Sequence, residues 1–256
     1  MKQILGISLL LASFSFQPAS AQILKKLGGK SSDSTKSEGN SILNNVINTG
    51  SKTGLSTDEI ASGLKEALSK GAEIGAGKLS ALDGYFGNAA IKILMPEEAK
   101  KVEQKLRSFG MGKQVDQAIL SMNRAAEDAA KSAAPIFVNA IKQMSIQDAM
   151  GILKGGDYAA TNYLKGKTTT ALTEAFRPVI ENSLEKVDAT KYWNAVFTAY
   201  NQFSKEKVNP DLVSFVTEKA LAGIFFQVGE EEKLIRKDPV ARTTELLKKV
   251  FSSSNQ

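Results

Sequence analysis

Charged residues at helical spacing are the strongest candidates for chemistry in this sequence. In the string NRAAE, Arg124 stands three residues before Glu127, and in the string EEEKLIRK, Glu232 stands four residues before Arg236. Both spacings place the two side chains on one face of a helix, where a carboxylate and a guanidinium can pair. Such pairs either join helices in the protein interior or line a binding site for an anion.

Arginine is rare in this chain, and its placement is informative. Only five of the 33 basic residues are arginine. The rigid, bidentate guanidinium suits planar pairing with carboxylates, whereas lysine suits a solvated surface. Glu232 shares an apolar stripe with Phe225, Val228 and Ile235. We therefore expect Glu232 to face inward and to require a partner.

Two interpretations of the C-terminal charged residues stay open. In the one that we favour, a buried network joins helices and is formed by Glu232, Arg236, Arg242 and Arg177, because buried charges are normally paired. In the alternative, Arg236, Arg242 and Arg177 line a pocket for a small anion or another ligand.

Three carboxylates raise a further hypothesis. Glu127, Asp148 and Asp157 could supply the acid–base pair of a glycosidase-type hydrolase, but the sequence does not show their separation. The simpler expectations are structural, because Asp148 and Asp157 stand at positions that cap helices. Arg124 lies opposite the apolar face of its helix, so we expect it to form an exposed ion pair with Glu127.

Composition excludes several classes of chemistry. The 256 residues include no histidine and no cysteine. This excludes the usual general base, the serine triad, thiolate metal sites and disulfides. The sequence also contains no calcium-binding loop and no phosphate-binding loop. We therefore predict no catalytic residue, no metal site and no cofactor.

The first residues predict an exported protein. Residues 1–21 combine a basic start at Lys2, a short apolar run and the small residues of a signal-peptide cleavage site, with cleavage expected after Ala21. Residues 22–54 are rich in Ser, Gly, Asn and Lys, which predicts a disordered, low-complexity linker. Residues 55–252 are expected to form the folded domain. The periplasm is the expected location.

Charge and two apolar clusters bear on partners. The net charge is +6, and one less after removal of Lys2. In an exported protein this charge favours a solvated surface or an anionic envelope component, and we expect no nucleic acid partner. The clusters at residues 23–27 and 42–47 allow peripheral contact with the envelope surface, although short helices docked on the domain are favoured. No stretch of the mature chain is expected to span a membrane.

Helical periodicity from Ser56 onward predicts an all-α, compact multi-helix domain with about eight to ten helices. The strings STDE at 56–59 and SIQD at 145–148 have the form of capping boxes. Pro96 suits the start of a helix that ends at Gly110.

Prolines mark expected interruptions. Pro135 is expected to kink or restart its helix, and Pro178 is expected to interrupt another. Asn209 and Pro210 are expected to begin the next helix, and residues 238–251 the last one.

Three shorter features complete the expected architecture. The string IKIL at 91–94 is the one plausible strand. The aromatic stripe over residues 192–203 is interpreted as core. Gly71, Gly75 and Gly77 either permit close contact between helices or weaken their own helix.

Six strings, in chain order, resemble domain-of-unknown-function family 4197, a bacterial exported family. They are GLKEAL (63–68), NRAAE (123–127), AIKQMSIQDAMGILKG (140–155), AATNYL (159–164), TEKAL (217–221) and EEEKLIRKDPVARTTELLKKVF (230–251). The resemblance covers about residues 55–251. It implies export but no established activity. The lipidated cysteine expected in some members has no counterpart here, because the chain lacks cysteine.

These observations favour a non-enzymatic binding or interaction module of the bacterial cell envelope, with an unknown partner. The alternative is a small-anion binder or a carboxylate-based hydrolase that uses the Arg- and Glu-rich C-terminal strings. Geometry separates the two: carboxylates facing each other across an open cleft favour the enzyme, and buried, fully paired arginines favour the structural role.

Overall fold

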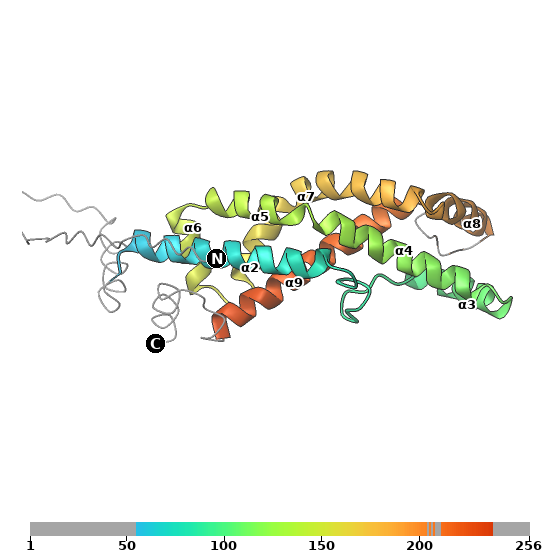
Figure 1. Cartoon of the computed structure of the whole chain (residues 1–256), viewed down its shortest axis with the longest axis horizontal. Coiled ribbons are helices and arrows are strands. Elements are labelled where there is room, and N and C mark those ends of the chain that lie inside the picture. Colours follow the sequence, from blue (N-terminus) through green and yellow to red (C-terminus); the bar gives the residue numbers. More distant parts are fainter. Residues whose placement is uncertain (1–54, 204, 206, 208–210, 238–256) are drawn as a thin grey trace, which may run out of the picture. The chain divides into compact units, whose positions relative to one another are not determined.

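The computed structural model describes residues 55–203, 205, 207 and 211–237. Within them the elements are α2 (Thr57–Ser80), the 3-10 turn η1 (Glu97–Ala99), α3 (Lys100–Ser108), α4 (Gly112–Ala130), α5 (Ala133–Lys142), α6 (Ile146–Lys154), α7 (Ala159–Glu185), α8 (Ala189–Phe203) and α9 (Leu212–Lys237). The described residues contain no strand, so the all-α expectation is confirmed (Figure 1). Their helices are fewer than the upper limit of ten that the sequence suggests.

The start of α2 is fixed by its own sequence. Ser56 accepts a hydrogen bond from the backbone N–H of Glu59, and the Glu59 side chain accepts one from the backbone of Ser56, which confirms the capping box. The glycines of α2 do not break the helix. A Cβ at Gly71 would lie 3.0 Å from Ile235, so this glycine permits close contact with α9.

The helix that begins near residue 112 ends before Pro135, as predicted. The chain leaves α4 at Lys131, and Pro135 stands in the first turn of α5, where its missing N–H removes no helical hydrogen bond. The prediction for Pro178 is wrong, because α7 runs unbroken through it. Pro178 is exposed, so water can reach the carbonyl of Glu174 that loses its partner.

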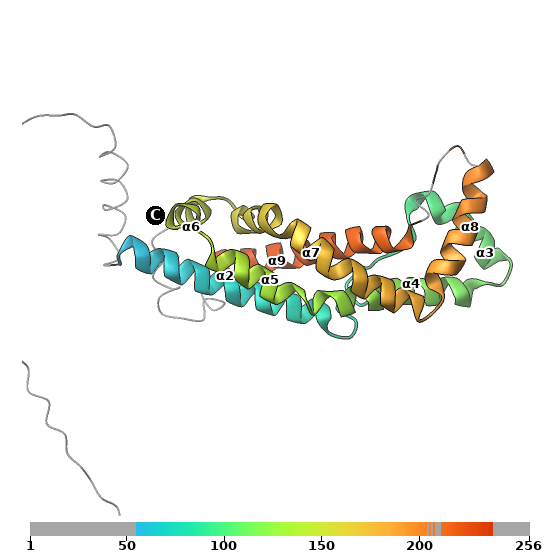
Figure 2. The ribbon, with the colours of Figure 1, turned by 90° about the horizontal axis from the view of Figure 1, so that it is seen from above.

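Helix α9 is the centre of the packing. It contacts α2, α4 and α7, and its residues Val216, Ala220 and Ile224 are fully buried. By length and composition alone α9 could cross a membrane. However, 67% of its apolar window is buried inside the protein, as is typical of the core helix of a soluble domain. Helix α9 packs along α2 and α7 in Figures 1 and 2.

Two expected features differ from the structure. Residues 91–94 form no strand, because no neighbouring strand offers backbone partners and a side chain of α4 takes that role. Pro96 precedes η1 rather than occupying the first turn of a long helix, and α3 ends at Ser108 before Gly110. Asn209, Pro210 and the helix expected over 238–251 lie outside the described residues.

Candidate functional site

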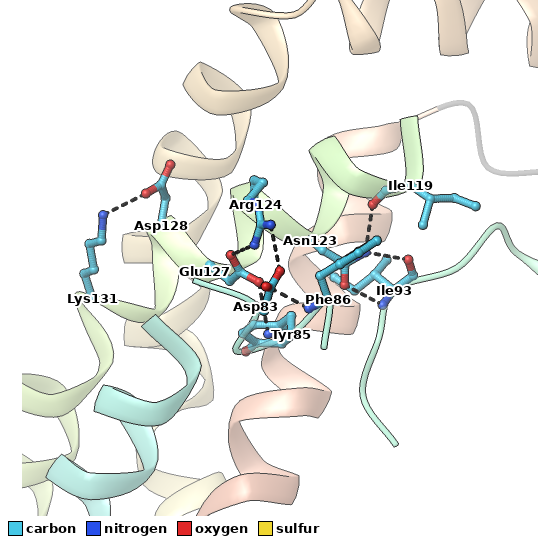
Figure 3. A network of polar contacts seen from close by, with 10 residues as sticks. All are labelled: Asp83, Tyr85, Phe86, Ile93, Ile119, Asn123, Arg124, Glu127, Asp128 and Lys131. Carbon is cyan, nitrogen blue, oxygen red and sulfur yellow. Dashed lines mark hydrogen bonds and ion pairs between the residues drawn. The ribbon is translucent and has the colours of Figure 1, made fainter. Parts of the chain in front are cut away.

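The NRAAE motif of α4 anchors the loop between α2 and η1 (residues 81–96, the α2–η1 loop). Asn123 is fully buried and binds the backbone of Ile93 twice: its Oδ1 accepts from the N–H at 2.9 Å, and its Nδ2 donates to the carbonyl at 2.8 Å. The same Nδ2 donates to the carbonyl of Ile119 at 2.7 Å. The Asn123 amide thus provides hydrogen-bond partners for the backbone of an extended segment that has no neighbouring strand (Figure 3).

Glu127 anchors the other end of this loop. Its Oε1 accepts hydrogen bonds from the backbone N–H groups of Tyr85 at 3.1 Å and Phe86 at 3.2 Å. Its Oε2 accepts from Arg124 at 2.6 Å, and Arg124 also binds Asp83 at 2.7 Å (Figure 3). The expectation of an exposed pair is therefore wrong for Glu127, which is 4% exposed. The α2–η1 loop covers this carboxylate and supplies the hydrogen bonds that its burial requires.

Tyr85 holds the α2–η1 loop against α9. Its side chain is fully buried, and its hydroxyl donates to the carbonyl of Ala220 at 2.7 Å. Burial raises the pKa of Tyr85 well above its usual range, with a contribution from the nearby charge of Glu127. A Cβ at Gly223 would overlap the Tyr85 ring. The absence of a side chain at Gly223 therefore makes room for the tyrosine.

We predict that Gly223→Ala lowers the free energy of unfolding by about 1–3 kcal/mol, because the added methyl group overlaps a fully buried ring that has no space to move. The matched control is Gly77→Ala in α2, where a Cβ would meet nothing within 4 Å. Removing a helical glycine there should stabilise the protein by about 1 kcal/mol. Urea denaturation measures both values. Equal shifts in the two variants would contradict the tight Tyr85–Gly223 contact.

The second polar motif lies near the C-terminal end of α9. Glu232 is 3% exposed, as the sequence predicts. Its carboxylate accepts from the backbone N–H groups of Ala160 at 2.9 Å and Thr161 at 2.8 Å, and from the Thr161 hydroxyl at 2.7 Å. It therefore caps the N-terminus of α7 from another helix, at the positive end of the helix dipole.

Arg236 completes this motif and ties it to α6. It donates to Glu232 from Nε at 2.9 Å and from Nη2 at 2.8 Å. It also donates to the carbonyls of Ile152 at 2.8 Å and Gly155 at 3.3 Å. The pair thus joins the end of α6, the start of α7 and α9. This is the arrangement expected of a structural network.

The arginines do not form one pocket. Arg177 binds Asp211 at 3.1 Å and Ser214 at 2.7 Å, at the start of α9. Arg236 lies near the opposite end of α9, and Arg177 lies about 27 Å along α7 from Ala159 at the helical rise per residue. An anion pocket shared by Arg177 and Arg236 is therefore excluded. Arg242 lies outside the described residues.

Each of the three carboxylates considered for a hydrolase forms a separate structural contact. Glu127 holds the α2–η1 loop, and Asp148 completes the capping box of α6 with Ser145. Asp157 does not cap α7, because Glu232 binds the N–H groups there. Asp157 instead pairs with Lys237 at 3.0 Å. The described residues contain no group of three or more acidic side chains placed to hold a metal ion.

Asp211 caps α9 and gives the fold a predictable pH dependence. Burial opposes its ionisation, but hydrogen bonds from the Ser214 backbone and hydroxyl and from Arg177 outweigh it and hold the pKa of Asp211 below its ordinary value of 3.8. A depressed pKa contributes stability that is present above the unfolded-state value and is lost as pH falls through the folded-state value.

We predict that Asp211→Asn lowers the melting temperature at neutral pH, because asparagine keeps the cap but loses the charge that pairs with Arg177. The difference from the wild type should shrink between about pH 5 and about pH 2, where Asp211 itself becomes protonated. Thermal melts across this range measure it. A difference that stays constant down to the acid end would show that the Asp211 charge contributes nothing.

An apolar cavity lies elsewhere, between η1, α3, α4, α8 and the start of α9 (the α3–α8 cavity). Its volume is about 700 Å³, within the range of about 300–1,000 Å³ typical of small-molecule sites. Thirteen of its eighteen lining residues are apolar: Met95, Ala99, Val102, Leu106, Met111, Val115, Ala118, Met122, Val187, Ala189, Trp193, Phe197 and Leu212. The polar ones are Glu103, Lys113, Gln114, Gln117 and Ser121.

The chemistry of this lining favours an apolar occupant. Three of the six methionines in the chain line the cavity, and methionine adapts its shape to varied apolar surfaces. Trp193 and Phe197 line it with ring centroids 4.3 Å apart. Glu103 is the one carboxylate among the described residues that line the cavity, and it is paired with Arg107 at 2.9 Å. No second carboxylate of the described lining faces Glu103 to form a hydrolytic pair.

Sequence reasoning missed the cavity and part of the anchor of the α2–η1 loop. The interpretation of Trp193 and Phe197 as core is confirmed by their burial, but they also form a cavity wall. Asn123 is detectable from the sequence: it stands four residues after Ile119 of the apolar face, so it lies on the buried side of α4. The cavity had no such signal, because it arises between helices that are far apart in the sequence.

Comparison with known proteins adds the family. A family model described as "Protein of unknown function (DUF4197)" matches residues 54–252. No curated protein and no solved structure matches the chain. The matched residues include both polar motifs and all residues that line the α3–α8 cavity.

Proposed function

The chain belongs to the family described as protein of unknown function DUF4197, and we propose that it is a non-enzymatic binding protein that holds the hydrocarbon portion of a small molecule in the α3–α8 cavity. The observation that carries this proposal is the lining of the cavity, which is apolar at thirteen of eighteen positions. An apolar chain gains free energy on leaving water for such a surface, at about 25 cal/mol per Å² buried.

The two polar motifs have structural roles, which leaves the cavity as the place where a ligand can bind. Glu127, Glu232 and Arg236 all form hydrogen bonds to backbone groups of other segments. The NRAAE motif lies beside the cavity wall. Asn123 fixes Ile93, two residues before the lining residue Met95, and Met122 beside it also lines the cavity.

We place this function in the bacterial envelope. The support is the signal-peptide pattern of residues 1–21. The envelope contains an aqueous compartment between membranes. A lipid-like molecule in that compartment requires a protein that shields its hydrocarbon from water. The apolar cavity of an exported helical domain meets that requirement.

A fluorescence titration tests the proposal. A dansyl-labelled fatty acid should bind the purified chain saturably, with increased and blue-shifted emission because the dye enters an apolar site. An unlabelled fatty acid should displace it. Emission that rises without saturation, or that no unlabelled fatty acid displaces, would overturn the proposal.

A further inference from the structure

The turn between α3 and α4 presents apolar side chains to solvent. Phe109 is 79% exposed and Met111 is 40% exposed. The turn is well defined, because Gly110 adopts a positive φ of 79° and the Met111 N–H donates to the carbonyl of Leu106 at 2.9 Å. A phenylalanine held at this exposure in a fixed turn contributes little to the core of its own domain.

Positive charge surrounds this turn. Between residues 101 and 116 the sequence has four basic and two acidic residues. Both acidic side chains, Glu103 and Asp116, pair with Arg107. Lys101, Lys105 and Lys113 form no ion pair with the described part of the chain. An apolar tip with lysines beside it matches the boundary between the hydrocarbon and the head groups of an anionic bilayer.

We propose that the α3–α4 turn docks on an anionic lipid bilayer, with Phe109 and Met111 entering the interface and the three lysines facing lipid head groups. The arrangement of the helices fits this role: α3 and α8 lie together at one end of the described helices in Figures 1 and 2. Met111 and Leu106 also line the α3–α8 cavity. Docking therefore brings the cavity next to a source of hydrocarbon chains, and this last step rests on the proposed function.

Vesicle co-sedimentation of the full purified chain tests the docking. The wild type should bind vesicles of phosphatidylglycerol and phosphatidylcholine, and bind pure phosphatidylcholine much more weakly. Phe109→Ser should weaken binding to the anionic vesicles by about tenfold, because one large apolar side chain is lost from the interface. Lys105→Ala with Lys113→Ala should also weaken it by about tenfold and reduce its dependence on salt.

Leu82→Ser is the matched control, because Leu82 is 78% exposed but lies in the α2–η1 loop away from the α3–α4 turn. It should bind vesicles like the wild type. Equal binding by Phe109→Ser and the wild type would overturn the proposal, as would equal binding to neutral and anionic vesicles. Concentration-dependent dimers that Phe109→Ser abolishes, without vesicle binding, would assign the turn to self-association instead. If the wild type binds no vesicles but still binds the fatty acid probe, the docking proposal fails and the proposed binding function of the cavity is retained.

Discussion

Replacing Glu232 with alanine is expected to lower the free energy of unfolding by about 3–5 kcal/mol. The carboxylate is 3% exposed and accepts hydrogen bonds from Ala160, Thr161 and Arg236. Its removal takes away one ion-pair partner of Arg236, whose side chain is only 12% exposed. It also removes the cap of α7. Thermal denaturation followed by circular dichroism should show a melting temperature lower by about 10 °C.

Lys233→Ala is the control for this experiment, because it changes a charged residue next to Glu232. Lys233 pairs with Glu230, and both side chains are partly exposed, at 30% and 41%. Its replacement should change the free energy of unfolding by less than about 1 kcal/mol. If the two variants melt alike, the C-terminal motif is not the structural network described above.

Filling the cavity should weaken ligand binding without unfolding the protein. Ala118 is half-buried on α4 and lines the α3–α8 cavity, so a tryptophan at this position can project its indole into the space that the ligand requires. Ala118→Trp should weaken binding of the dansyl-labelled fatty acid by at least about tenfold, equivalent to about 1.4 kcal/mol. Its melting temperature should match or exceed that of the wild type, because a filled cavity gains packing contacts.

Ala171→Trp provides the matched control. Ala171 is exposed on α7 and does not line the cavity. This variant adds the same side chain to the surface and should bind the probe like the wild type. Equal weakening in both variants would show that the probe does not occupy the cavity between α3 and α8.

The sequence predicts a local feature correctly where residues of a single helix determine it. Ser56 and Glu59 form their capping box within four consecutive residues. Glu232 was correctly expected to face inward, because its position on an apolar stripe determines its direction. The break before Pro135 follows from the missing N–H in the same way.

Predictions failed where a distant segment decides the environment. Glu127 was expected to be exposed, because the helical pattern of α4 does not reveal that the α2–η1 loop folds over it. Asp157 was expected to cap α7, but Glu232 arrives from α9 and takes the N–H groups. The α3–α8 cavity depends on tertiary contacts among several helices, so no local pattern could indicate it.

The central claim is that the α3–α8 cavity holds an apolar molecule, and native mass spectrometry of protein purified from its native cells tests it most directly. The wild type should show an added mass that dissociates on extraction with organic solvent. The Ala118→Trp variant, purified in parallel, should lack it, because the indole occupies the same space. A wild-type protein that carries no added mass, or an Ala118→Trp variant that retains the same one, would contradict the claim.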